Sequence, residues 1–327
     1  MKMEDIGFYT LCDERVKNVS LTTPMWRCEM LLTDVCNFHC PYCRGLKPAL
    51  RGTMSLSFAK KVIDLWSVNG LRNIRFSGGE PTLHPHLKEL VAYSKSKGVE
   101  RIAISTNGYS SLALYKELVA LGINDFSISL DACCSSTFGR GIRVPWEKVS
   151  QVFVQKIAEN IRELSKLTYV TLGMVFTEET VNYVADVVNF GHSLGVADIR
   201  IISAAQYNRL LVGLSKIPQS VLDAHPILKY RVTNFLKSRN VRGITKKDFH
   251  HCALVLDDAA AAGCYHFPCI IYLREGGEPI GKIGPKMRLE RGEWFKAHDS
   301  FKDEICRKNC LDVCVDYNNK YRELHNV

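Results

Sequence analysis

The first two hundred residues alternate between two kinds of apolar pattern. Short runs rich in aliphatic and aromatic residues predict strands, and the segments between them place apolar residues three and four positions apart, which predicts helices. Strands are predicted at 25–32, 74–76, 101–105, 125–130, 169–176 and 199–202. Helices are predicted between Ser55 and Gly70, between Pro85 and Gly98, and over 112–121, 153–164 and 181–194.

Six strand–helix repeats predict an α/β fold. Parallel strands joined by helices take right-handed crossovers, and we expect six of them to form a partial (β/α)6 TIM-like barrel rather than a closed one. The alternating core is expected to span 25–205, after an N-terminal extension at 1–24. A basic segment with helical periodicity, 206–250, is predicted to be a helical linker, and 251–327 a separate small domain.

Composition places the chain among ordinary globular proteins. Of its 327 residues, 46% are hydrophobic and 24% are charged, values typical of a soluble domain. Its apolar runs are shorter than the roughly 18 residues of a membrane span, and residues 1–5 carry acids instead of a signal peptide's apolar segment. Thirteen cysteines without an export signal favour metal or redox chemistry in a reducing cytoplasm.

The formal net charge of +9 is a weak indication of an anionic partner. It counts every cysteine as neutral, and two thiolate-bound iron–sulfur clusters would lower it to about +6. Basic tracts interleaved with aromatic residues, the pattern that single-stranded nucleic acid prefers, are not evident in the sequence. We therefore expect neither a nucleic acid nor a membrane as the partner.

Three closely spaced cysteines, Cys36, Cys40 and Cys43, follow the first predicted strand. Three thiolates can hold three irons of a [4Fe–4S] cluster, which leaves the fourth iron open to a non-protein ligand. A zinc knuckle that takes its fourth ligand from further along the chain is the alternative. The C-x3-C-x2-C pattern, with Tyr42 before the third cysteine, resembles the signature of the radical S-adenosylmethionine (SAM) superfamily.

This resemblance implies a chemistry for the three cysteines. In the superfamily the open iron is chelated by the amino and carboxylate groups of SAM. Electron transfer from the cluster then cleaves SAM to methionine and a 5′-deoxyadenosyl radical.

The polar motifs at the ends of the next predicted strands extend the resemblance. Ser77-Gly78-Gly79-Glu80-Pro81 ends the second strand and resembles the superfamily's Gly-Gly-Glu motif, which contacts the SAM amino group. On its own it could be a strand-to-helix turn, because glycine adopts dihedrals that other residues avoid. Polar groups after the third and fourth strands resemble the segments that touch the SAM ribose and carboxylate, although such residues also cap helices.

The superfamily's fifth strand supplies apolar and backbone contacts to adenine, and the segment around Met174 fits that role. The resemblance covers about residues 25–205. The cofactor-binding set that it implies comprises Tyr42, Gly78, Gly79, Glu80, Ser105, Asn107, Ser129, Asp131 and Met174.

Six cysteines lie in the C-terminal segment: Cys252, Cys264, Cys269, Cys306, Cys310 and Cys314. Residues 274–278 between them are predicted to form a hairpin turn. A cysteine pair around a hairpin, followed by a closely spaced group, resembles the auxiliary-cluster domains called twitch and SPASM. The sequence departs from the full SPASM pattern, so one auxiliary [4Fe–4S] cluster is expected, on Cys252, Cys269, Cys306 and Cys310, with Cys314 as substitute. A structural zinc on the same thiols is the alternative.

The resemblance predicts an enzyme with SAM and two [4Fe–4S] clusters that abstracts hydrogen from a peptide or a small molecule, with flavodoxin or ferredoxin as reductant. A second possibility is a cousin of the enzyme of molybdenum-cofactor biosynthesis that rearranges GTP. That enzyme carries a C-x2-C-x13-C tail pattern and a Gly-Gly end, which are both missing here. A non-enzymatic iron–sulfur electron carrier is the third possibility.

Overall fold

The computed structural model describes residues 13–68, 70–131, 150–207, 209, 211–239 and 241–327. The chain divides into two compact units, of which the first comprises 1–35, 44–102 and 242–327, and the second 36–43 and 103–241. Cys12, Cys133 and Cys134 lie outside the described residues, whereas Cys28 is fully buried in the first unit.

Strand β1 (Arg27–Thr33) is central in the sheet of the first unit. It pairs in parallel with β2 (Asn73–Gly78) on one side and with β7 (Asp258–Ala262) on the other. Strand β7 continues through an antiparallel hairpin into β8 (Tyr265–Phe267), which pairs with β9 (Gly281–Lys282). The C-terminal segment therefore extends the sheet that the N-terminal strands begin.

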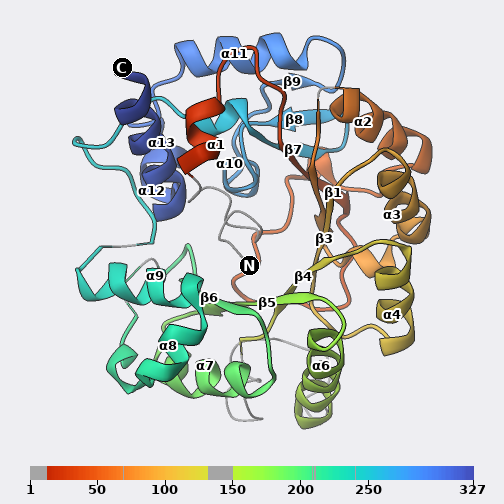
Figure 1. The fold of residues 1–327 in the computed structure, drawn as a ribbon, viewed down its shortest axis with the longest axis vertical. Coiled ribbons are helices and arrows are strands. Elements are labelled where there is room, and N and C mark those ends of the chain that lie inside the picture. Colours follow the sequence, from red (N-terminus) through yellow and green to blue (C-terminus); the bar gives the residue numbers. More distant parts are fainter. Residues whose placement is uncertain (1–12, 69, 132–149, 208, 210, 240) are drawn as a thin grey trace. The chain divides into compact units, whose positions relative to one another are not determined.

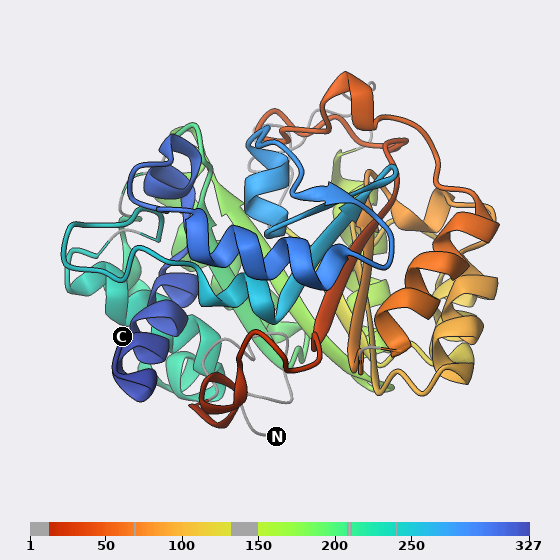
Figure 2. The same ribbon diagram turned by 90° about the horizontal axis from the view of Figure 1, so that it is seen from above.

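The helices of the first unit pack around this sheet, and several of them belong to the C-terminal segment. Helices α2 and α3 lie side by side (Figures 1 and 2). Helix α1 packs against α13, and α11 packs against η7. The α-helices are α1 (Asp13–Asn18), α2 (Leu56–Val68), α3 (Leu87–Ser96), α10 (Ile270–Arg274), α11 (Met287–Ala297), α12 (Glu304–Asn309) and α13 (Asp312–His325). Its short 3-10 helices are η3 (Pro48–Leu50), η4 (Pro81–Leu83) and η7 (Ala253–Leu256).

The second unit repeats the strand–helix alternation. Strands β3 (Arg101–Thr106), β4 (Asp125–Ser129), β5 (Tyr169–Phe176) and β6 (Asp198–Ser203) pair in parallel in chain order. The α-helices are α4 (Leu112–Leu121), α6 (Ser150–Ser165), α7 (Val184–Ser193), α8 (Gln219–Ala224) and α9 (Pro226–Leu236), with η5 (Val181–Tyr183) and η6 (Leu214–Lys216) as 3-10 turns. Figure 1 shows α7, α8 and α9 grouped beside β6.

The fold class is the predicted one, an α/β protein with the strand–helix alternation of a partial TIM-like barrel that is not closed. The predicted helix 112–121 and strand 169–176 coincide with α4 and β5. Ser111 explains the start of α4, because its side chain accepts a hydrogen bond from the Leu114 N–H at 3.2 Å. Among the described residues, none of the helices is long and apolar enough to cross a membrane.

The predicted hairpin turn at 274–278 is wrong. Helix α10 occupies 270–274, and the Cys269 thiol caps it by accepting a hydrogen bond from the Tyr272 N–H at 3.4 Å. Gly276 ends the helix with a φ of 80°, a left-handed conformation that glycine adopts without strain. The hairpin of this region is instead the β7–β8 pair, which lies between Cys252 and Cys269 in the chain.

Candidate functional site

The cysteine loop, Cys36–Cys43, carries three free thiols within eight residues. A hydrogen bond from the Cys43 N–H to the Cys40 carbonyl at 3.0 Å closes a turn within the loop. Phe38 anchors it, because its buried ring lies 5.7 Å from Tyr109 and 5.9 Å from Phe153. The loop is therefore held by an aromatic cluster while its cysteines stay half-buried or exposed.

The thiols of this loop fit a metal cluster. Burial raises the pKa of Cys40 to about 12, so without a cation this thiol stays protonated at neutral pH. Cys36 Sγ accepts a hydrogen bond from the Phe38 N–H at 3.4 Å, the kind of contact that tunes cluster-bound sulfur. A donor set of three thiols suits a [4Fe–4S] cluster with one open iron.

Tyr42 and Asp131, both predicted to contact SAM, contact each other. The Tyr42 hydroxyl donates to Asp131 Oδ2, and the Val175 N–H donates to Asp131 Oδ1 at 2.6 Å. Burial raises the pKa of Asp131 to about 6, and burial also raises the pKa of Tyr42. The carboxylate thus joins the cysteine loop to the ends of β4 and β5, and Gln206 adds a hydrogen bond to the Tyr42 carbonyl at 3.3 Å.

Asn107 also contacts the cysteine loop. Its Nδ2 donates to Asn37 Oδ1 at 2.8 Å, and its Oδ1 accepts from the Tyr109 N–H at 3.0 Å. Ser105 is half-buried and Ser129 is exposed at the end of β4. Ser105 and Ser129 lie at the carboxyl ends of the paired strands β3 and β4, and Asn107 directly follows β3, so they lie at the edge where parallel strands place ligand sites.

Met174 lies on the side of β5 that faces helix α7. It is fully buried, and its Cε lies 2.5 Å from the position that a Cβ on Gly191 would occupy. Its neighbours on the opposite face, Gly173 and Val175, are half-buried. Met174 can therefore offer its backbone to a ligand, whereas its side chain is committed to the helix.

The Gly-Gly-Glu motif, Gly78, Gly79 and Glu80, packs against residues 33–35. The Gly79 N–H donates to the Thr33 carbonyl at 2.6 Å, and the Glu80 N–H donates to the Val35 carbonyl at 2.8 Å. A Cβ at Gly78 would lie 2.3 Å from the Thr33 oxygen, and one at Gly79 would lie 2.2 Å from the Val35 oxygen. Glycine is therefore required at both positions.

The Glu80 carboxylate is buried and caps η4. Its Oε1 accepts from the Thr82 N–H at 3.0 Å and from the Thr82 hydroxyl at 2.7 Å. The motif is thus a rigid turn with both backbone and carboxylate held in place.

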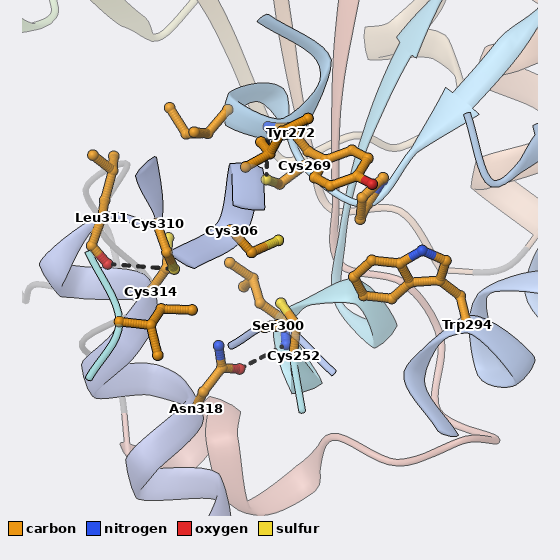
Figure 3. Close-up of a pocket in the computed structure, with 15 residues that line it drawn as sticks. Cys252, Cys269, Tyr272, Trp294, Ser300, Cys306, Cys310, Leu311, Cys314 and Asn318 are labelled. Carbon is orange, nitrogen blue, oxygen red and sulfur yellow. Dashed lines mark hydrogen bonds between the residues drawn. The ribbon is translucent and has the colours of Figure 1, made fainter. Parts of the chain in front are cut away.

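A second group of thiols forms the cysteine pocket, drawn in Figure 3. Its five cysteines come from four different places in the C-terminal segment, and Figure 3 shows their side chains gathered around one space. They are Cys252 before η7, Cys269 at the start of α10, Cys306 and Cys310 on and after α12, and Cys314 in α13. Cys264 is exposed in the β7–β8 turn and does not line the pocket.

The cysteine pocket is lined mainly by sulfurs and apolar side chains, with Tyr272, Ser300 and Asn318 as polar lining residues. Aliphatic residues such as Leu254, Ile271 and Ile305 line it, and burial raises the pKa of Cys252 to about 11. Burial also raises the pKa values of Cys269 and Cys306 well above the ordinary range. Several buried thiols become thiolates together only when a cation offsets their charge, so this donor set fits an iron–sulfur cluster or zinc.

A polar network that the sequence did not predict borders the cysteine pocket. Asp303 caps α12 by accepting from the Cys306 N–H at 2.8 Å, and Tyr272 donates to Asp303 at 3.0 Å. His298 Nε2 lies 3.8 Å from Cys306 Sγ, and its ring stacks on Trp294. An aspartate three residues before Cys306 is a helix-start signal, whereas nothing in the local pattern marks His298.

We compared the chain with known proteins, and the region that matches a family includes the cysteine loop. Residues 30–191 match the model of the radical SAM superfamily. The chain is 33% identical over 115 residues to the GTP 3′,8-cyclase of Synechococcus elongatus, covering 34% of this chain and 35% of the cyclase. It is 35% identical over 105 residues to that of Chlorobaculum tepidum, covering 32% of each chain. The chain thus spans about a third of these curated relatives.

Solved structures resemble more of the chain at lower identity. Streptococcus suis SuiB bound to the precursor peptide SuiA gives a TM-score of 0.60 at 12% identity, over 94% of this chain and 79% of SuiB. The enzyme anSMEcpe with bound AdoMet gives 0.59 at 15% identity, over 93% of this chain and 95% of that protein. These likenesses concern the fold. The superfamily match shows that residues 30–191 of the chain form a radical SAM domain.

Proposed function

We propose that the chain cleaves SAM reductively at Cys36, Cys40 and Cys43 and abstracts hydrogen from a peptide or small-molecule substrate. The observation that carries this proposal is the cysteine loop, whose free thiols are held by Phe38 and by the Tyr42–Asp131 contact. When bound, the cluster supplies the electron that cleaves SAM to methionine and a 5′-deoxyadenosyl radical.

The residues of the chain would hold and orient the cofactors. Asp131 and Asn107 fix the cysteine loop to the strand ends. The Gly-Gly-Glu motif would present backbone carbonyls and the Glu80 carboxylate to the SAM amino group, and its close packing against residues 33–35 holds these groups in place. Ser105 and Ser129 would contact the ribose and carboxylate of SAM. Residues fixed in this way would orient SAM before it reacts.

The cysteine pocket would hold an auxiliary [4Fe–4S] cluster. Four thiolates complete such a cluster and leave no open iron, which favours accepting an electron from a substrate radical over binding the substrate. The expected ligands are Cys252, Cys269, Cys306 and Cys310, with Cys314 as the alternative to Cys310, since all five line the pocket. Clusters of this type are kept in a reducing compartment, so we expect a cytoplasmic enzyme served by flavodoxin or ferredoxin.

Two observations bear on the substrate. The likeness to SuiB, which was solved with a precursor peptide, extends over 94% of this chain and so includes the cysteine-rich segment. The likeness to GTP 3′,8-cyclases covers about a third of the chain at 33–35% identity, and 53% of it at 26% identity for the probable cyclase of Sulfurisphaera tokodaii. A peptide and a nucleotide are therefore both candidate substrates, and the test below includes each.

The direct test uses anaerobically reconstituted protein with dithionite and SAM. We expect slow release of 5′-deoxyadenosine, and none from the Cys36→Ala/Cys40→Ala/Cys43→Ala variant. Cluster-replete protein that releases none would indicate an electron carrier instead. Adding GTP or candidate peptides then identifies the substrate class, since the true substrate accelerates the release.

A further inference from the structure

Arg274, the last residue of α10, contacts the Gly-Gly-Glu motif. Its guanidinium donates from Nη2 to the Gly78 carbonyl at 2.6 Å and from Nη1 to the Gly45 carbonyl at 3.1 Å. Gly45 follows the cysteine loop in the chain, and Gly78 begins the motif. One side chain of the cysteine-rich segment therefore holds the backbone of the Gly-Gly-Glu motif and of Gly45, two residues after Cys43.

The Gly78–Gly79 peptide is fixed at both ends. Arg274 holds its carbonyl, and the Gly79 N–H donates to the Thr33 carbonyl at 2.6 Å. Gly78 has a φ of 138°, a conformation that residues with a Cβ rarely adopt. Thr33 therefore holds the amide end of this peptide and Arg274 holds its carbonyl end, so that loss of the Arg274 side chain would leave only the amide end fixed by these two contacts.

The residues around Arg274 support the same attachment. Glu275 pairs with Arg44, and Glu278 lies 2.7 Å from Lys47. The Lys47–Glu278 pair is largely exposed, and such pairs stabilise proteins little. A guanidinium with two simultaneous hydrogen bonds has a defined direction that a single ammonium lacks. Arg274 is therefore the group that determines the geometry.

Helix α10 connects this contact to the cysteine pocket. The helix starts at the cap residue Cys269, which lines the pocket, and ends at Arg274. A single five-residue helix therefore links a residue that lines the pocket to the contact with Gly78. We propose that Arg274 is a positioning residue that holds the Gly78–Gly79 peptide in the conformation that binds SAM. This inference rests on the proposed role of the Gly-Gly-Glu motif in SAM binding.

The alternative is that Arg274 merely stabilises the fold, and the chain offers a matched control. Arg288 is also half-buried and also donates to two backbone carbonyls, those of Leu256 and Ser20, at 2.7 Å each. Replacement of Arg274 or Arg288 by Gln removes a comparable pair of hydrogen bonds, but only the first pair involves the Gly-Gly-Glu motif.

The test measures SAM affinity of the reconstituted R274Q, R288Q and wild-type proteins by equilibrium dialysis, with iron content and melting temperature alongside. The EPR spectrum of the reduced catalytic cluster with and without SAM gives a second readout. We expect R274Q to bind SAM about tenfold more weakly, the factor that about 1.4 kcal/mol produces, and to keep its iron content. R288Q should bind SAM like the wild type.

The possible outcomes distinguish a failure of the proposed function from a failure of the inference about Arg274. Wild-type protein that binds no SAM contradicts the proposed function. If the wild type binds SAM and R274Q binds it equally well with the same EPR change, Arg274 is not a positioning residue; equal losses in R274Q and R288Q also overturn the inference. Should R274Q fail to fold, R274K decides the matter. Its single ammonium keeps the charge but cannot span both carbonyls, so we expect an intermediate loss of affinity.

Discussion

Because Gly79 has no Cβ, its main chain can lie directly against residues 33–35. We expect Gly79→Ala to weaken SAM binding and to lower the free energy of unfolding by about 1–3 kcal/mol. The added Cβ would lie 2.2 Å from the Val35 carbonyl oxygen, a backbone atom of the segment that directly follows β1. Denaturant unfolding and equilibrium dialysis with SAM measure the two effects.

Gly284→Ala is the control for this substitution. A Cβ at Gly284 would lie 4.0 Å from the nearest neighbouring atom, the Lys282 carbonyl oxygen, an ordinary contact distance. The control should therefore retain stability and SAM affinity. A Gly79→Ala protein that matched Gly284→Ala in both measurements would show that the close approach is unimportant.

The sequence predicted a set of site residues but not the contacts between their side chains. Cys36, Cys40 and Cys43 were predictable because their spacing is local. The pairing of Tyr42 with Asp131 joins residues that lie 89 positions apart, and no local pattern encodes such a contact. The side chain of Met174 faces α7 because successive side chains along β5 point to opposite faces of the sheet. The sequence did not indicate which side chains take which face, because the apolar run of this strand is continuous.

At the scale of elements, Asp198 of β6 joins the strand to the start of α9. Its carboxylate accepts from the Ile227 N–H at 3.0 Å and from the Leu228 N–H at 3.4 Å, two groups that the helix itself leaves unpaired. Burial nevertheless raises the pKa of Asp198 to about 6. The folded protein therefore binds a proton here more tightly than the unfolded chain, where an aspartate has a pKa of about 3.9.

This shift predicts a pH dependence of stability. Relative to Asp198→Asn, the wild type should lose on the order of 2 kcal/mol of unfolding free energy as the pH rises from about 4 to about 6, and little above that. The sign follows because a raised pKa favours the folded state only while the group is protonated. Subtracting the curve of the Asn variant, which cannot titrate, removes contributions from other groups. A difference that stays constant from pH 4 to pH 7 would contradict this account of Asp198.

The elements were predictable where the pattern was long and local, as in α4 and β5. The parallel pairing of β7 with β1 was not, because it joins residues more than 200 positions apart and uses four successive alanines, which have low strand propensity. The helix at 270–274 was missed for a related reason. Its start depends on the Cys269 thiol cap, and cysteine is not among the residues that usually signal a helix start.

At the scale of the whole molecule, two separate groups of free thiols predict two clusters. Anaerobically reconstituted protein should hold about eight irons, and the Cys36→Ala/Cys40→Ala/Cys43→Ala variant about four. The prediction rests on three cysteines in the loop and five in the pocket. Elemental analysis for iron, sulfide and zinc measures it. About four irons in the intact protein, together with bound zinc, would show that the cysteine pocket is a structural zinc site.

The central claim is a division of labour, in which the cysteine loop serves SAM cleavage and the cysteine pocket serves the substrate. The most direct test measures 5′-deoxyadenosine release at saturating SAM from the Cys306→Ala/Cys310→Ala variant. We predict release at a rate similar to that of the wild type, because the altered thiols lie in the pocket and leave Cys36, Cys40 and Cys43 in place. Loss of 5′-deoxyadenosine from this variant, with its four catalytic irons still present, would contradict the account.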